Sequence, residues 1–380
     1  MTGQKRSGAA GPSGRIASLD LIRGIAVLGI LLMNALTFAL EPAGYSNLEQ
    51  DGVTNPIDWL VGVLGIVFVQ QKMMALFSLL FGVGVVIFAD NASAKQRRPV
   101  ALSLWRFTLL GLMGIGHTLV WWGDVLLVYA LCAPIVVGVR RMGSSTLLAV
   151  GGILAISGSV AAVVVQGGVN SGDLTLGDYW LIDAGPMSAG AEWWYVLDVF
   201  GRALGLMLIG VALYRLGVVD GSRDTQWYRR LTRWGLSVGL ALTLSGVAIH
   251  VANRWSEDTA LLGHAPIGLG TIPMAVGYLG IILRWAQGWT SHHDRLAATG
   301  RMALTNYLSQ TILGLTTLAV IAEAVDVPRS MILVWVIGVW ALQVTWSTWW
   351  LARFRFGPAE WLWRCGTYRA WQPLRRRDME

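Results

Sequence analysis

Histidine, carboxylate and amide side chains inside apolar segments are the residues of this sequence that could carry out chemistry. His117 lies about 15 residues into an apolar segment that begins near residue 102, and Asp124 follows after a Trp-Trp-Gly turn. An imidazole at membrane depth is costly and usually faces a bundle interior or a cavity. A carboxylate beside an imidazole is the usual arrangement of a general base. The pair therefore predicts either proton transfer at His117 or a packed, structural histidine.

Polar residues in the first apolar segment raise a similar choice. Asp20 and Arg23 are three residues apart and share one face of a helix, which indicates a local ion pair or a site for an anionic ligand. Asn34 lies deeper, at about the height expected for His117. We expect its side chain either to form a hydrogen bond between helices or to belong to the same site as His117. Arg106 repeats the position of Arg23 on the segment that carries His117.

Two amides mark another segment near the C-terminal end. Asn306 and Gln310 are four residues apart and share one helical face, with Arg301 at its base, so they predict a polar-lined cavity. Lys72 begins an apolar segment after two glutamines, and we expect an anchor at the outer membrane surface or a coupling charge.

Composition decides the class of protein. The chain has 380 residues, of which 54% are hydrophobic and 13% charged, whereas soluble domains are roughly 25% charged. The sequence is therefore that of an integral membrane protein, and its net charge of +7 is better explained by membrane orientation than by nucleic-acid binding. Cys132 and Cys365 offer neither a disulfide framework nor metal-ligand spacing, so we expect no metal and no nucleic acid.

Ten apolar windows are long enough to cross a bilayer. They cover residues 20–40, 72–90, 102–121, 123–139, 144–165, 197–217, 233–252, 266–286, 301–322 and 329–352. The window 57–71 has an apolar core that is too short to cross and indicates a re-entrant or interfacial half-helix on the outer side.

Loop charges support that interpretation of 57–71. If this window does not cross, the basic loop 91–101 and every later basic loop lie inside, and the acidic loops 41–56 and 166–196 lie outside. We therefore predict an all-α polytopic bundle with both termini in the cytoplasm. It comprises a flexible basic segment (1–15), one transmembrane domain (16–352) and a basic amphipathic tail (353–380) that would lie on the anionic inner leaflet.

Five separated blocks resemble the YeiB family of bacterial inner-membrane proteins. They are LDLIRGIAVLGILLMN, KMMALFSLLFGVGV, GHTLVWWGDVLLVYAL, GRMALTNYLSQT and GPAEWLWR, which occur in the family's order between about residues 15 and 370. The family is grouped with the transmembrane acyltransferase superfamily, beside the lysosomal heparan-glucosaminide acetyltransferase and the acyltransferase-3 proteins. The resemblance implies a multi-pass protein of the bacterial cytoplasmic membrane.

The resemblance also implies an activity, the transfer of an acyl group from cytoplasmic acyl-CoA (with acetyl-CoA as the expected donor) to a glycan, lipid or small molecule outside. His117, tuned by Asp124, would be the base, and Asn34 or Asn306 would stabilise the oxyanion. Residues expected to bind the donor are Arg23, Arg106, Arg301, Asn306 and Gln310. The acetyltransferase relatives carry their catalytic histidine shortly after the first helix, whereas residues 41–56 contain none here, so His117 would have to take that role.

Other functions fit the same polar residues. A transporter or flippase would use the cavity as a substrate path, with Asp124, Lys72 and Arg23 as gating or coupling charges. A non-catalytic membrane organiser would need these residues for stability alone. The sequence leaves a homodimer open.

Overall fold

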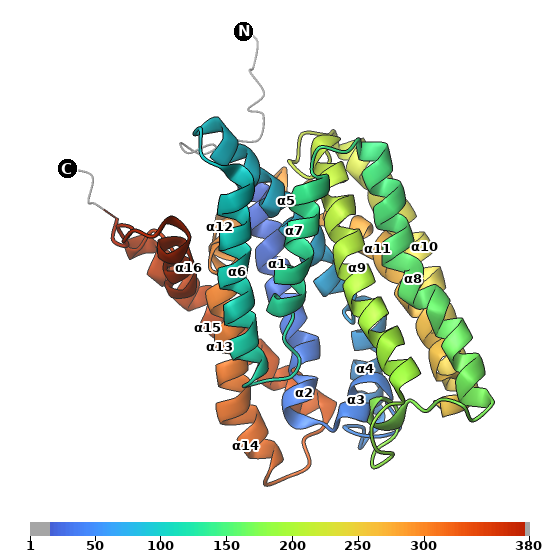
Figure 1. The fold of residues 1–380 in the computed structure, drawn as a ribbon. Coiled ribbons are helices and arrows are strands. Elements are labelled where there is room, and N and C mark those ends of the chain that lie inside the picture. Colours follow the sequence, from blue (N-terminus) through green and yellow to red (C-terminus); the bar gives the residue numbers. More distant parts are fainter. Residues whose placement is uncertain (1–15, 377–380) are drawn as a thin grey trace.

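The computed structural model describes residues 16–376 and shows a bundle of helices, which confirms the predicted fold class (Figure 1). Within these residues, β pairing is limited to one isolated bridge, between Phe354 and Arg375. Long helices run in alternating directions between two ends of the bundle. We call the end at which α1 (Ala17–Asn34) begins the inner end, and the opposite end the outer end.

The other α-helices follow in chain order. They are α2 (Leu36–Ala39), α3 (Pro42–Ser46), α4 (Pro56–Phe68), α5 (Lys72–Ala94), α6 (Pro99–Thr118), α7 (Leu126–Val139), α8 (Ser144–Asn170), α9 (Ala189–Arg215), α10 (Thr225–Ala252), α11 (Ala260–Ala286), α12 (Ser291–Arg301), α13 (Ala303–Leu313), α14 (Ala319–Ala322), α15 (Arg329–Arg353) and α16 (Pro358–Tyr368). A π-helical turn, Gly314–Leu318, joins α13 to α14. In the described chain, 9 helical segments are long and apolar enough to cross a membrane, and the shorter α7 corresponds to the expected window 123–139.

The break between α4 and α5 explains the awkward window 57–71. Gln71 has a φ of 62°, in the left-handed region, and ends the helical path of α4. Helix α4 has 13 residues and is about 20 Å long, less than the roughly 30 Å hydrocarbon core. It fills the outer half of the bundle, and α5 completes the crossing (Figure 1). The basic loop after α5 therefore lies at the inner end, as predicted.

Lys72 is not at the outer membrane surface, where the sequence placed it. Because α4 occupies the outer half, the first residue of α5 lies well inside the bundle. Its side chain is fully buried, and its Nζ donates to the carbonyl oxygen of Ile66 at 2.8 Å. The lysine thus satisfies a carbonyl that the break leaves without its helical partner.

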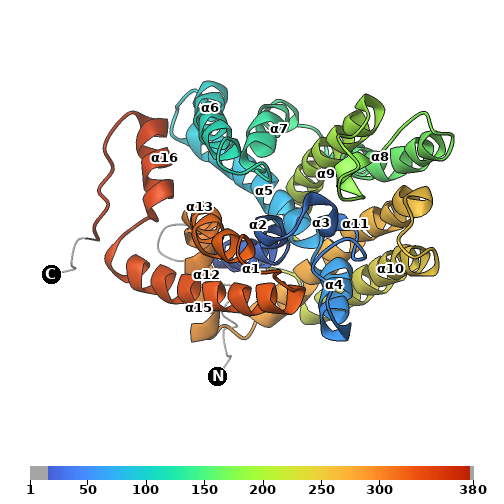
Figure 2. The ribbon, with the colours of Figure 1, turned by 90° about the horizontal axis from the view of Figure 1, so that it is seen from below.

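Helix α5 lies at the centre of the bundle, surrounded by α1, α7, α9 and α11 (Figure 2). Glycines permit the closest approaches. A Cβ on Gly82 of α5 would collide with the backbone carbonyl of Met207 on α9, and a Cβ on Gly300 of α12 would collide with that of Asp20 on α1. Small residues at such crossings are typical of membrane helices, which associate through close packing.

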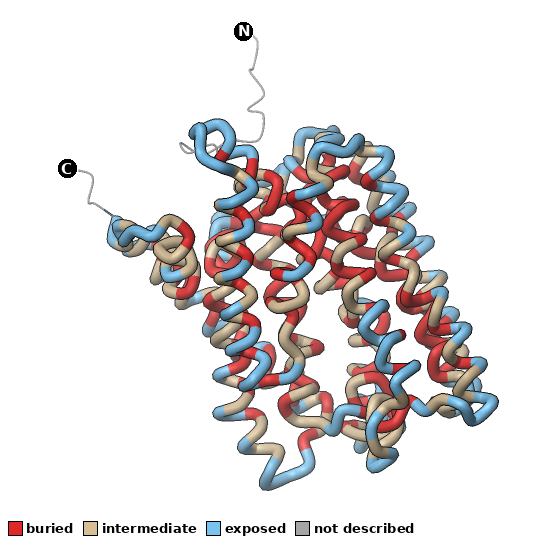
Figure 3. Tube along the Cα trace, in the orientation of Figure 1, coloured by how far each residue is buried: buried red, intermediate tan, exposed pale blue. Residues whose placement is uncertain are grey.

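The periphery of the bundle is apolar as well. Large side chains such as Val164, Trp234 and Val334 are exposed on α8, α10 and α15, and exposed positions recur along α8 in Figure 3. A soluble monomer rarely exposes apolar surface on this scale. The surface suits contact with lipid chains.

The tail helix α16 is docked against the bundle at the inner end. Trp363 Nε1 donates to the carbonyl oxygen of Arg106 at 2.9 Å. The Glu360 carboxylate accepts hydrogen bonds from the backbone N–H of Leu304 at 2.7 Å and the hydroxyl of Thr305 at 2.6 Å, at the start of α13. Burial raises the pKa of Glu360, and the hydrogen bonds from α13 oppose that shift. The tail therefore forms part of the wall around the interior of the bundle.

Candidate functional site

His117 lies at the outer end of α6, where its two ring nitrogens have separate partners. Nδ1 lies 2.7 Å from Asp124 Oδ1, and Nε2 lies 3.0 Å from Thr311 Oγ1 on α13. An ionised carboxylate can only accept a hydrogen bond, so Nδ1 donates to Asp124 and Nε2 accepts from the Thr311 hydroxyl. The arrangement leaves the basic nitrogen of a neutral imidazole facing a hydroxyl group.

Asp124 is held by the turn between α6 and α7. Its Oδ2 accepts from the backbone N–H of Leu127 at 2.9 Å, and its side chain is fully buried. The start of a helix stabilises a negative charge through its free N–H groups and its dipole. The short Trp-Trp-Gly-Asp turn thus places the carboxylate at the start of α7 and directs it at His117.

Aromatic rings enclose the imidazole. The ring centroids of Trp121 and Tyr307 lie 5.7 Å and 5.3 Å from that of His117. Trp121 Nε1 donates to Thr37 Oγ1 at 3.0 Å, and that hydroxyl donates to the backbone carbonyl oxygen of Asn34 at 2.8 Å. Asn34 therefore connects to the site through its backbone, at the end of α1.

A cavity of about 450 Å³ leads from the inner end toward this site. Arg301, Arg355 and Arg364 are among the residues lining its inner part, whereas Val125 and Tyr307 line its far end. The residues between are mainly apolar, among them Phe77, Phe81, Leu110, Leu126 and Tyr129. His117 is not among the residues that line the cavity, but its ring centroid lies 5.3 Å from that of Tyr307, which does line it. The cavity is therefore basic at one end and apolar along its length, and a neighbour of His117 lines its far end.

Three arginines expected to bind a donor line this same cavity, namely Arg23, Arg106 and Arg301. The Arg106 guanidinium carbon lies 3.5 Å from the ring centroid of Trp363, so α16 fixes its orientation. Arg23 Nη1 donates to Asp20 Oδ1 at 3.0 Å, which is the local ion pair considered from the sequence. Arg23 therefore forms this ion pair and also lines the cavity.

Asn306 and Gln310 share one face, as predicted, but the structure places them away from the cavity lining. Asn306 Nδ2 donates to Ser347 Oγ at 3.0 Å, and Gln310 Nε2 donates to Gln343 Oε1 at 2.9 Å. Both partners lie on α15. The two amides are buried because they join α13 to α15 by hydrogen bonds, a use that spacing alone cannot distinguish from a lined cavity.

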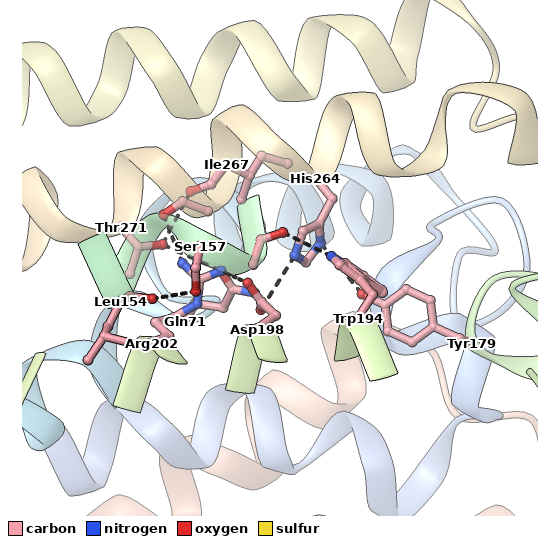
Figure 4. Close-up of polar contacts among 12 residues, drawn as sticks. Gln71, Leu154, Ser157, Tyr179, Trp194, Asp198, Arg202, His264, Ile267 and Thr271 are labelled. Atoms are coloured by element: carbon pink, nitrogen blue, oxygen red, sulfur yellow. Dashed lines mark hydrogen bonds and ion pairs between the residues drawn. The ribbon is translucent and has the colours of Figure 1, made fainter. Parts of the chain in front are cut away.

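A second buried polar cluster lies between α9 and α11 and was missed in the sequence (Figure 4). Arg202 forms an ion pair with Asp198 and donates to the carbonyl oxygen of Gly268 at 2.9 Å. His264 Nε2 lies 3.8 Å from Asp198 Oδ2, and its Nδ1 lies 3.5 Å from the hydroxyl of Tyr179. Burial raises the pKa of Tyr179, so the phenol stays neutral and can donate.

One feature of the sequence could have revealed this cluster. Asp198 and Arg202 are four residues apart with opposite charge in an apolar helix. His264 precedes the expected apolar window 266–286, whereas α11 begins at Ala260 and includes it. His117 is thus one of several histidines buried in these helices, together with His250 and His264.

The described residues contain no group of three or more His, Cys, Asp or Glu side chains placed to hold a metal ion. An imidazole oriented by a carboxylate, as His117 is by Asp124, is suited to proton transfer.

Comparison with known proteins gives three relatives of similar length. YeiB of Escherichia coli (strain K12), described as uncharacterized, is 31% identical over 94% of this chain and 98% of its own. YxaH of Bacillus subtilis (strain 168), also described as uncharacterized, is 28% identical over 96% of both chains. An uncharacterized 39.9 kDa protein from the amylase 3′ region of Bacillus acidopullulyticus is 26% identical over 95% of this chain and 96% of its own. Residues 213–370 match the model "Protein of unknown function (DUF418)". No solved structure matches the chain significantly.

Proposed function

This chain belongs to the YeiB family and is a multi-pass membrane protein, and we propose that it is an acyltransferase. The donor is cytoplasmic acyl-CoA, with acetyl-CoA as the simplest case. The acceptor is a hydroxyl or amine at the outer side of the bacterial cytoplasmic membrane. The observation that carries the proposal is the cavity, because a basic entrance followed by an apolar passage matches a molecule with phosphates at one end and a thioester at the other.

The arginines at the inner end supply the donor's electrostatic partners. Arg23, Arg106 and Arg301 line the cavity from three different helices. Guanidinium groups bind phosphate oxygens through paired N–H donors in a planar fork. With the diphosphate next to the pantetheine arm held there, the arm extends between apolar side chains toward Val125 and Tyr307.

His117 acts as the general base in this proposal. As the acceptor oxygen or nitrogen attacks the thioester carbonyl, its proton passes to His117 Nε2, and Asp124 stabilises the resulting imidazolium. The carbon–sulfur bond then breaks, and the CoA thiolate takes the proton from the imidazolium as it leaves. Two movements are required: the Tyr307 ring must open the end of the cavity, and the acceptor must replace the Thr311 hydroxyl at Nε2.

Acyl-CoA binding and turnover by the purified full-length protein in lipid nanodiscs test the proposal. We expect wild-type protein to bind acetyl-CoA in calorimetry and to release CoA thiol when a membrane extract supplies acceptors. His117→Ala should bind acetyl-CoA and release thiol at least about 100-fold more slowly, since general-base catalysis contributes about 10²–10⁴-fold. His292→Ala, on the exposed inner end of α12, is the matched control. Wild-type protein without affinity for acetyl-CoA would exclude the proposal.

The Asp198–Arg202–His264 cluster favours a second candidate, a transporter. Ionisable residues buried in membrane helices commonly mark ion or substrate paths, and none of these three lines the cavity that leads to His117. Vesicles containing the protein and a pH-sensitive dye separate the candidates. Proton flux that is independent of acyl-CoA and lost in Asp198→Asn would favour transport.

A further inference from the structure

A second cavity, of about 560 Å³, lies at the inner end between the loop after α5 and the tail helix α16. Its wall carries five cationic side chains, Lys95, Arg97, Arg98, Arg364 and Arg369. None of the described residues that line it is acidic. Several like charges around one hollow repel one another unless an anion lies between them. The composition of the wall therefore indicates an anionic ligand.

Aromatic rings hold three of these arginines in place. The guanidinium carbons of Arg97 and Arg364 lie 4.9 Å and 5.2 Å from the ring centroid of Tyr368. That of Arg369 lies 4.7 Å from the ring centroid of Trp105. Stacking engages the face of a guanidinium and leaves the N–H groups on its edge available to an anion. The guanidinium planes are thus fixed before a ligand arrives.

One of the arginines also has an unused donor. Arg364 Nε is buried and has no hydrogen-bond partner among the described residues. A buried donor without a partner costs free energy that a bound acceptor would recover. The donor set as a whole suits phosphate oxygens, which accept paired N–H bonds from arginine.

Arg364 joins this second cavity to the one that leads toward His117, because it lines both. We propose that the second cavity binds the phosphate-bearing nucleotide end of the acyl donor, and that Arg364 lies where the nucleotide passes into the apolar passage. This proposal builds on the proposed acyltransferase function and adds a residue set to it. The phosphate of an anionic lipid shares the same chemistry and is the alternative that the experiment must separate.

Calorimetric titration with adenosine 3′,5′-bisphosphate, which carries the nucleotide phosphates without a thiol, tests the assignment. The protein is the full chain in nanodiscs of zwitterionic lipid, and inorganic phosphate is titrated separately. The pocket variant is Arg97→Gln with Arg369→Gln. The control, Arg229→Gln with Arg230→Gln, removes the same charge from exposed positions near the inner end of α10. We expect the pocket variant to bind the bisphosphate at least about tenfold more weakly and the control to match wild type.

Four outcomes decide the proposal. Equal binding by the pocket variant and the control overturns it. It is also overturned if wild type does not bind the bisphosphate. In that case, an unfolding temperature that anionic lipid raises in wild type but not in the pocket variant assigns the cavity to lipid. If wild type binds the bisphosphate, the pocket variant does not, and wild type transfers no acyl group, the result supports this site and contradicts the acyltransferase function. Acyl transfer with an unchanged KM for acyl-CoA in the pocket variant contradicts this site alone. Lys95→Gln provides a second variant if the double variant does not fold.

Discussion

Thr311 Oγ1 lies 3.0 Å from His117 Nε2, although the two residues are 194 positions apart in the chain. This contact joins α13 to α6 at the site and completes the set of partners around the imidazole. Thr311 is itself buried, with 2% of its surface exposed. It is thus a positioning residue for the nitrogen that we expect to take the proton.

Replacing Thr311 tests that role. Thr311→Val keeps the shape of the side chain and removes the hydroxyl, so Nε2 loses its partner. We expect kcat/KM to fall about tenfold, because in the free protein the imidazole loses one positioning hydrogen bond of about 1.4 kcal/mol. The pH dependence of kcat/KM, which reports the free protein, should shift as well. Thr311→Ser should restore both. A Val variant with the wild-type pH profile would show that the contact only supports packing.

Asp124→Asn tests the carboxylate. The amide can still accept from Leu127, but it no longer favours the imidazolium at His117. We expect thiol release to fall by at least about 100-fold, with acetyl-CoA binding retained. Asp173→Asn, on the exposed outer loop, removes the same charge as a control. Turnover equal to that of wild type would assign Asp124 to capping α7 and not to catalysis.

The helix crossing at Gly82 predicts a stability difference between two glycines. Gly82→Ala would place a Cβ against the Met207 carbonyl, whereas a Cβ at Gly152 on α8 meets no atom within 4 Å. We expect Gly82→Ala to lower the free energy of unfolding by about 1–3 kcal/mol. Gly152→Ala should raise it by about 0.5–1 kcal/mol. Denaturant unfolding in detergent micelles measures both, and equal effects would contradict the close approach of α5 and α9.

The direction of the bundle in the membrane can be tested with cysteines introduced one at a time in a Cys365→Ser background, in which the remaining Cys132 is buried. We expect Ala184→Cys, in the outer loop after α8, to react with a membrane-impermeant maleimide on intact cells. Gln96→Cys, in the basic loop after α5, should react only in inside-out vesicles. Labelling of Gln96→Cys on intact cells would reverse the orientation derived from loop charges.

Much of the fold could be predicted from the sequence because membrane helices are encoded by local apolarity and loop charge. The basic loop at Lys95 correctly indicated that the window 57–71 does not cross on its own. The spacing of His117 and Asp124 indicated their contact because a short turn joins them. Thr311 could not be found in this way, since helix packing alone brings it to the site.

Helix packing also explains why Asn306 and Gln310 do not line the cavity. The spacing of Asn306 and Gln310 shows that they share one helical face. It does not show which helix packs against that face, and in the structure this helix is α15.

His264 lies before the apolar window 266–286 because apolar windows begin where polar residues stop, whereas α11 begins at Ala260. Asp198 lies inside the window 197–217, but apolarity alone does not reveal the partners that helix packing brings to it.

The left-handed break at Gln71 has a consequence for the biogenesis of the protein. Residues 56–94 form one apolar stretch of 39 residues with a lysine in its interior, and a lysine near the bilayer centre costs about 3 kcal/mol. The Gln71 side chain accepts from Thr271 at 3.5 Å, a residue 200 positions later. The break is therefore enclosed by its final neighbours only after the ribosome has added α9 and α11. Until then, the Ile66 carbonyl of its own segment is the hydrogen-bond partner available to the Lys72 ammonium.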